Sequence, residues 1–120
     1  MSAGTGRSVL LVEDDALLGD LTAEVMRACG AGRVRLATSV GDALEAIDDA
    51  DYDVVVIDLT LPDGSPEPLA RRAEDRGAKV VFFSGASPTE ALEGRPLITK
   101  PAPPEVWRRL FAAQSQEGGA

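Results

Sequence analysis

The sequence feature that most limits the fold is a series of short aliphatic runs separated by segments with helical spacing. The runs are mostly β-branched and continuously apolar, and they lie at Val9–Val12, Val34–Ala37, Val54–Ile57, Val80–Phe83 and, more weakly, Leu97–Thr99. Strands that are apolar on both faces are typical of parallel sheets covered by helices. The sequence therefore predicts five buried, parallel strands.

The segments between these runs have the spacing of amphipathic helices. We predict helices over Ala16–Cys29, Ser39–Asp49, Leu69–Arg76, Thr89–Glu93 and Pro104–Ala113, of which the fourth is very short. In the first, Leu17, Leu18, Leu21 and Val25 fall on one side, the pattern of a helix that packs through its apolar face. Strands that alternate with helices imply right-handed crossovers. The predicted fold class is α/β, a doubly wound five-stranded parallel sheet with a shortened fourth helix.

The length of 120 residues is that of one domain, which we place at residues 8–114. Residues 1–7 and 115–120 are rich in small residues, and we expect them to be flexible tails. No apolar run has the length of a membrane span, and the first residues lack the apolar core of a signal peptide. We therefore expect a cytoplasmic, free-standing domain that does not engage a membrane.

Charge and missing residue types exclude several functions. The chain has 20 acidic and 12 basic residues, a formal charge of -8, which argues against nucleic acid or an anionic membrane as partner. It has no histidine, which excludes Ser-His-Asp triads, imidazole metal sites and a phosphohistidine of its own. Cys29 is the only cysteine, so an intrachain disulfide is impossible.

Polar side chains lie at the carboxyl ends of four of the predicted strands. Glu13, Asp14 and Asp15 follow the first, and Asp58 follows the third. Ser84 and Lys100 close the fourth and fifth, respectively. The carboxyl ends of parallel strands share one edge of a sheet, where ligands bind in open α/β folds. We therefore expect these sequence-distant residues to converge.

Such a set of side chains suits phosphoryl chemistry. Clustered carboxylates repel one another and have raised pKa values unless a cation is present. Their hard oxygen atoms are suitable ligands for Mg²⁺ or Mn²⁺. A metal ion and Lys100 can neutralise a phosphoryl group, Ser84 can donate a hydrogen bond to it, and a carboxylate can attack it in line.

The motifs resemble the receiver domain of two-component response regulators from Val9 to Phe111. The matching segments are Leu11–Asp15, Val56–Gly64, Ser84–Gly85 and Thr99–Pro101. The resemblance implies a flavodoxin-like fold and a phosphorelay function that depends on Mg²⁺. It also implies a histidine kinase or histidine phosphotransfer protein as phosphoryl donor and an unknown downstream protein, with the chain a monomer or weak dimer.

The resemblance assigns the metal site to Glu13, Asp14, Asp58 and Thr60. Asp14 resembles a direct ligand and Glu13 a ligand through water, while Thr60 corresponds to the residue whose backbone carbonyl binds the metal ion. The metal would be Mg²⁺, with Mn²⁺ as the substitute.

The resemblance assigns the reaction itself to three residues. Asp58 resembles the phospho-accepting aspartate, Ser84 the switch hydroxyl and Lys100 the phosphate-binding lysine. The Lys100-Pro101 bond is expected to be cis. Turnover of an external substrate is not expected, because such domains catalyse only their own phosphorylation and dephosphorylation.

The sequence departs from the family pattern in the segments associated with output. Leu97 occupies the position where family members usually carry an aromatic switch residue, and Ser84 to Lys100 is short, which limits the fourth helix. The third helical region, Glu67 to Arg76, is also somewhat short. These departures put in doubt signalling through the face formed by the fourth helix, the fifth strand and the last helix.

Three alternatives remain beside the phospho-acceptor. The chain could be a receiver-like adaptor that binds partners without phosphorylation, or a receiver segment cut from a hybrid sensor kinase. An aspartyl phosphatase is disfavoured, because Thr60 stands where such enzymes carry a second aspartate as general acid. The acids between Asp48 and Asp53 are interpreted as a solvated face rather than a docking surface.

Overall fold

A single parallel sheet organises the chain, as the apolar runs predict. The computed structural model describes residues 7–62, 64–85 and 94–119, and residues 113–119 by their backbone alone. The strands are β1 (Arg7–Val12), β2 (Ala31–Ala37), β3 (Val54–Asp58), β4 (Lys79–Ser84) and β5 (Leu97–Thr99). They are paired in parallel in the order β2-β1-β3-β4-β5. The predicted fold class is confirmed.

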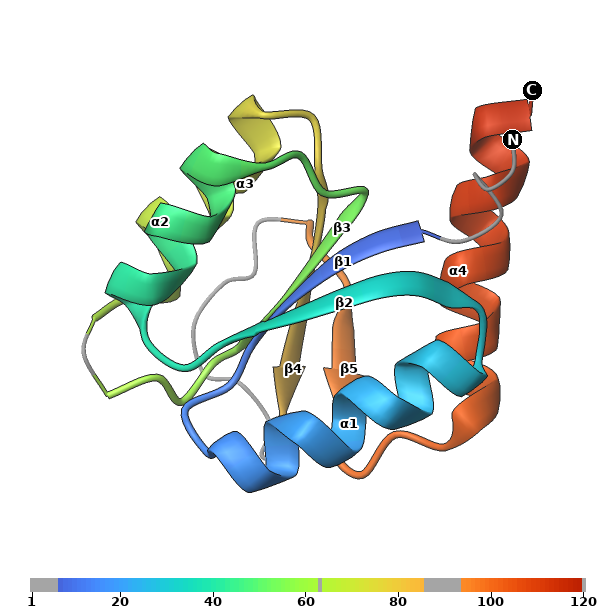
Figure 1. Ribbon diagram of the computed structural model, residues 1–120, viewed down its shortest axis with the longest axis horizontal. Coiled ribbons are helices and arrows are strands. Elements are labelled where there is room, and N and C mark those ends of the chain that lie inside the picture. The colour runs from blue at the N-terminus through green and yellow to red at the C-terminus, as the bar shows by residue number, and fades with distance from the viewer. Residues whose placement is uncertain (1–6, 63, 86–93, 120) are drawn as a thin grey trace.

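Helices cover both faces of this sheet. Those described are α1 (Ala16–Ala28), α2 (Val40–Asp49), α3 (Pro66–Asp75) and α4 (Pro104–Gly119). Figure 1 shows α2 and α3 on one face and α1 and α4 on the other. The short helix predicted at Thr89–Glu93, the shortened fourth helix of the expected fold, lies outside the described residues. None of the described helices combines the length and apolarity needed to cross a bilayer.

Two predicted helix boundaries differ from the structure by more than one residue. The helix α3 begins at Pro66 rather than Leu69, because the Ser65 hydroxyl accepts a hydrogen bond from Glu67 N and proline fits the first turn. The helix α4 continues to Gly119, beyond the predicted end at Ala113 and into the residues expected to form a tail. The second predicted helix agrees to within one residue, because Ser39 caps α2.

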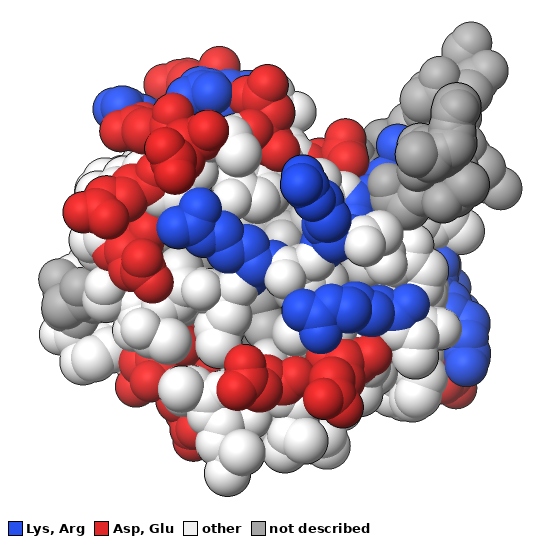
Figure 2. Space-filling model, in the orientation of Figure 1, with Lys and Arg blue, Asp and Glu red and all other residues white. Residues whose placement is uncertain are grey.

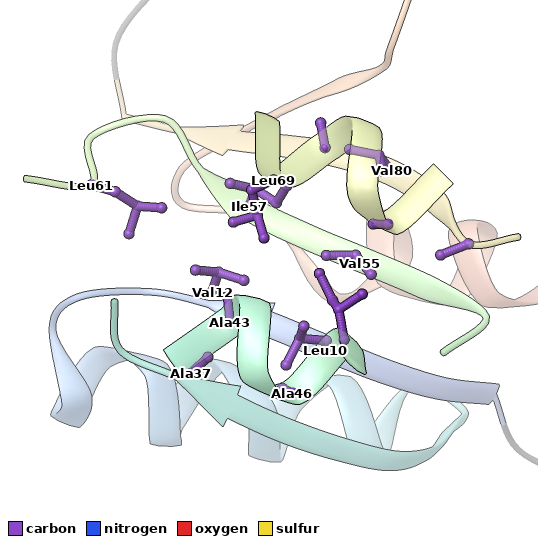
Figure 3. Close-up of a cluster of buried hydrophobic side chains, with 14 of the residues drawn as sticks. Leu10, Val12, Ala37, Ala43, Ala46, Val55, Ile57, Leu61, Leu69 and Val80 are labelled. Carbon is purple, nitrogen blue, oxygen red and sulfur yellow. The ribbon is translucent and has the colours of Figure 1, made fainter. Parts of the chain in front are cut away.

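The apolar core consists of two clusters, one on each face of the sheet. Figure 3 shows the cluster beneath α2 and α3, where Leu10, Val55 and Leu69 meet. The other lies beneath α1 and α4 and contains Met26, Phe83 and Trp107. Strands β1 and β3 contribute to both clusters, which explains why their sequences are apolar without alternation.

The orientation of α1 is the main departure from the predicted packing. The four side chains of the predicted apolar face point outward, with Leu17 72% and Leu21 55% exposed. The buried residues are Gly19, Ala23 and Met26 instead. A Cβ atom on Gly19 would lie 2.6 Å from Leu36 Cδ1, so the small residues allow α1 to approach β2 closely. The amphipathic pattern is present, but its leucines and Val25 lie largely outside the core, and Met26 is the large side chain of α1 that is buried.

The acidic residues around the end of α2 are paired within the chain. Asp48 lies 2.6 Å from Arg72, Asp51 lies 2.9 Å from Arg76, and the more distant Arg35–Asp49 pair spans 3.9 Å. Figure 2 shows acidic and basic side chains side by side over α2 and α3. Such exposed pairs add little stability, in agreement with the interpretation of this region as a solvated face.

Arg95 connects the segment before β5 to α3. Its guanidinium donates hydrogen bonds to both carboxylate oxygens of Glu74, at 2.8 Å each, and to Glu67 Oε1 at 2.9 Å. The Arg95 side chain is only 9% exposed and also lies over the Phe82 ring. The hydrogen bond from Arg95 lowers the pKa of Glu74, and those from Arg71 and Arg95 lower the pKa of Glu67.

This network predicts a pH-dependent contribution to stability. A carboxyl group whose pKa is lower in the folded state stabilises the fold above its unfolded value, near 4.5, and loses this contribution as pH falls through the folded value. We expect Arg95→Met to be less stable than the native chain at pH 7, with a difference that narrows below pH 4.5. Urea denaturation across this range measures the difference. Arg33→Met, at an exposed position of β2, is the control, and its stability difference from the native chain should not narrow at low pH. A difference for Arg95→Met that stays constant across this pH range would contradict the prediction.

Candidate functional site

The polar residues at the strand ends converge at one edge of the sheet. Glu13 follows β1, Asp58 and Ser84 end β3 and β4, and Lys100 follows β5. Lys100 Nζ lies 2.7 Å from Glu13 Oε2 and 2.8 Å from Asp58 Oδ2. Glu13, Asp58 and Lys100, which are up to 87 positions apart in the sequence, therefore meet at this edge.

Asp58 is fully buried and has hydrogen-bond donors at both carboxylate oxygens. Thr60 donates to Oδ1 from its backbone N at 2.8 Å and from its hydroxyl at 2.7 Å, while Lys100 donates to Oδ2. Burial disfavours the charged carboxylate, but the hydrogen bonds from Lys100 and Thr60 outweigh that effect and lower the pKa of Asp58. The pKa shift thus favours the ionised form of Asp58 although its side chain is buried.

Glu13 is the second buried carboxylate of the site and is only 2% exposed. Its Oε1 accepts a hydrogen bond from Asp15 N at 3.2 Å, and its Oε2 accepts one from Lys100. Burial raises the pKa of Glu13, although the hydrogen bond from Lys100 opposes the change. The pKa values of the two carboxyl groups therefore shift in opposite directions, because Asp58 accepts more hydrogen bonds than Glu13.

Lys100 supplies the positive charge between these carboxylates. Burial opposes its charge, but the hydrogen bonds to Asp58 and Glu13 outweigh that effect and raise the pKa of Lys100. Its backbone N donates to Ser84 O at 2.8 Å, which ties the end of β5 to the end of β4. The expected cis bond between Lys100 and Pro101 is present.

The donor set at this edge fits a hard divalent cation. Carboxylate oxygens of Glu13, Asp14 and Asp58 lie within 4.8 Å of one another. Asp14 is exposed, so a metal ion bound there could keep water ligands, as Mg²⁺ prefers. The acidic cluster can therefore hold a metal ion.

Three other residues of the sequence prediction have distinct surroundings. Ser84 is 4% exposed, and its backbone carbonyl accepts a hydrogen bond from Lys100 N. Asp15 lies outside the acidic cluster and caps α1, because its carboxylate accepts a hydrogen bond from Leu18 N at 3.0 Å. Leu97, which replaces the usual aromatic, is partly buried against the cluster beneath α2 and α3.

The hydroxyl contact of Thr60 was missed by sequence reasoning, which considered only the backbone carbonyl of this residue. The sequence does indicate this contact, because Thr60 follows Asp58 by two residues. An aspartate carboxylate readily accepts hydrogen bonds from the residue two positions after it. Thr60 thus orients Asp58 whether or not its carbonyl binds a metal ion.

An apolar groove adjoins the site between α1 and α4. Its volume is about 360 Å³, and it is lined by Leu18, Leu21, Thr22, Val25, Phe83, Lys100, Pro101, Ala102 and Trp107. Lys100 belongs to both the groove and the ionic cluster. The sequence did not reveal this groove, because an outward apolar face has the same helical spacing as an inward one.

Comparisons with known proteins agree with this geometry. The model of the response regulator receiver domain family matches residues 9–95. The swarming motility regulation protein RssB of Serratia marcescens is 28% identical in an alignment 123 positions long. This alignment covers 93% of this chain. The match spans 55% of that relative's length.

Solved structures show the same fold. A CheY-like receiver domain from Methylobacillus flagellatus is 26% identical, with a TM-score of 0.81, and the match covers 92% of this chain and 99% of that one. The BeF3-activated DrrB receiver domain is 24% identical, with a TM-score of 0.76 and coverage of 92% and 98%. A two-component response regulator from Clostridium difficile, 16% identical, has a TM-score of 0.81 and coverage of 93% and 98%.

The acidic cluster predicts metal binding that depends on Asp14 and not on the neighbouring Asp15. We expect Asp14→Asn to weaken Mg²⁺ binding about tenfold or more, because one anionic ligand is lost. Isothermal titration calorimetry measures this affinity. Asp15→Asn is the matched control, since it removes the same charge one residue away and asparagine preserves the helix cap. Equal losses in the two variants would show that overall charge, rather than ligation, controls binding.

Proposed function

This chain belongs to the response regulator receiver domain family, and from that premise we propose that Asp58 accepts a phosphoryl group from a partner's phosphohistidine. The observation that carries the proposal is the buried contact of Lys100 with Asp58 and Glu13 beside Asp14. Receiver domains of two-component systems interact with histidine kinases or phosphotransfer proteins. This chain has no histidine, so the donor histidine lies outside these 120 residues.

In the proposed reaction, a carboxylate oxygen of Asp58 attacks the phosphorus atom of the donor. The new O–P bond forms as the P–N bond breaks, and the leaving histidine nitrogen retains the electron pair of that bond. Asp58 becomes an acyl phosphate. The lowered pKa of Asp58 supports its role as nucleophile, because the carboxylate is ionised before the donor arrives.

The other site residues would stabilise the transferred group. Lys100 would exchange its hydrogen bond to Asp58 Oδ2 for one to a phosphoryl oxygen, and the Ser84 hydroxyl would donate to another. We place the metal ion with Glu13, Asp14, Asp58 and the Thr60 carbonyl. When bound, Mg²⁺ would neutralise charge on the phosphoryl oxygens.

Phosphorylation would change the contacts that hold this edge of the sheet. In the unphosphorylated chain, Lys100 after β5 and Thr60 after β3 both donate hydrogen bonds to the Asp58 carboxylate. A phosphoryl group adds charge and acceptor atoms at that point, so both donors must redistribute. We propose that this redistribution alters the surface offered to a downstream protein.

The exposed face of α1 supports a protein donor rather than a small molecule. Leu17 and Leu21 are largely exposed, and Leu21 lines the same groove as Lys100. Exposed apolar surface next to a reactive group suits a protein contact. We propose that the phosphohistidine protein rests on this face while its histidine reaches Asp58.

The proposed acceptor is tested with Mg²⁺ and a small phosphodonor such as phosphoramidate. We expect the native chain to gain one phosphoryl group by mass spectrometry and Asp58→Asn to gain none. Asp49→Asn, at an exposed acid on α2, should behave as the native chain does. A mass gain in Asp58→Asn would remove Asp58 from this role, and partner binding indifferent to Asp58→Ala would favour the adaptor alternative.

The proposed docking face is tested by comparing two kinds of donor. Leu21→Glu should slow transfer from a phosphohistidine protein about tenfold or more, because a charge replaces an apolar side chain that would contact the partner. Phosphorylation by phosphoramidate should be unchanged. Ala50→Glu adds the same charge at an exposed position at the end of α2 and should affect neither reaction. Equal slowing with both donors would place the defect in the site rather than in docking.

A further inference from the structure

We propose that Phe83 is a positioning residue for Lys100, holding its ammonium group over an aromatic ring next to Asp58. The Lys100 Nζ atom lies 4.9 Å from the centroid of the Phe83 ring. A cation at this distance is attracted to the face of the ring. The inference rests on the proposed function, because the position of Lys100 matters for catalysis only if Asp58 is phosphorylated.

The sheet places Phe83 beside the reactive carboxylate. Phe83 pairs with Asp58 in the register of β3 and β4, and its carbonyl accepts a hydrogen bond from Leu59 N at 3.0 Å. On its other side Phe83 pairs with Ile98 of β5, two residues before Lys100. The ring is therefore fixed to the strands that carry both the nucleophile and the lysine.

Two further aromatic residues hold the ring in place. Trp107 meets Phe83 edge-on, with centroids 5.4 Å apart and planes at 70°, and Trp107 stacks on Phe111 at 6.5 Å. All three rings are at least 96% buried, since their exposed fractions are 4%, 2% and 4% for Phe83, Trp107 and Phe111. Close packing on α4 restricts rotation of Phe83, so the aromatic surface facing Lys100 is preorganised.

The ring contact complements the hydrogen bonds of the lysine. Two carboxylates accept hydrogen bonds from the ammonium group now, but the bond to Asp58 Oδ2 must be given up when the phosphoryl group arrives. The ring can keep its attraction for the cation during this exchange. The Lys100 side chain is 21% exposed and lines the apolar groove, so without the ring it has room to move away from Asp58.

Phe83 could instead serve only to pack the core. The neighbouring residue Phe82 distinguishes this interpretation from a positioning role. Phe82 lies on the same strand, is equally buried at 2% exposure, and faces the opposite side of the sheet. Its ring contacts Arg95 instead of Lys100. Phe82→Leu therefore removes the same atoms from the core without removing the ring beside Lys100.

The test compares phosphorylation time courses of the native chain, Phe83→Leu, Phe82→Leu and Phe83→Tyr, with Mg²⁺ and phosphoramidate. We expect Phe83→Leu to react about tenfold more slowly, within the range that a partly desolvated cation–π contact supports. Phe82→Leu should stay within about twofold of the native rate, and Phe83→Tyr should restore it. A native rate in Phe83→Leu, or equal slowing in both leucine variants, would overturn the proposal.

A spectroscopic comparison reports on the contact itself. By NMR, ring currents should shift the Lys100 side-chain protons upfield in the native chain, Phe82→Leu and Phe83→Tyr, and this shift should be lost in Phe83→Leu. An unchanged Lys100 spectrum in Phe83→Leu would contradict the positioning role. Failure of the native chain to gain a phosphoryl group would overturn the proposed function instead, and the NMR comparison would still decide whether Phe83 positions the lysine.

Discussion

The buried contact of one lysine with two carboxylates is the interaction on which this edge of the molecule depends. Glu13 and Asp58 are almost fully inaccessible to water, and each accepts a hydrogen bond from Lys100. Buried charges are costly unless they are paired, so any one of these groups would be poorly tolerated alone. The parallel sheet makes the pairing possible, because it brings the ends of β1, β3 and β5 to the same edge.

Much of this arrangement could be predicted from residue order. The central strands were recognisable because their runs Val9–Val12 and Val54–Ile57 are buried on both faces of the sheet and are therefore continuously apolar. The site was recognisable because Glu13, Asp58, Ser84 and Lys100 follow or end such strands, where topology requires convergence. The fold prediction was confirmed, and Glu13, Asp58 and Lys100 do meet, because both follow from a local pattern combined with a general rule of sheet geometry.

Other features depend on contacts that a local pattern does not encode. The apolar spacing of α1 was correct, but only the close approach of Gly19 to Leu36 determines that the larger residues face outward. The start of α3 lies three residues before the predicted one, because Ser65 caps the helix and Pro66 fits its first turn. The ring of Phe83 was assigned to a strand, whereas its proximity to Lys100 follows from side-chain packing across β4 and β5.

The small inner face of α1 separates two demands that proteins often place on the same side chains. Gly19 and Ala23 pack toward the core, while Leu17 and Leu21 are largely in solvent. Substitutions of these exposed leucines can therefore remodel the outer surface without opening a cavity beneath the sheet. Recognition can diverge during evolution while the chemistry around Asp58 is inherited unchanged, so duplicated copies of such a chain could acquire different partners by altering one helix face.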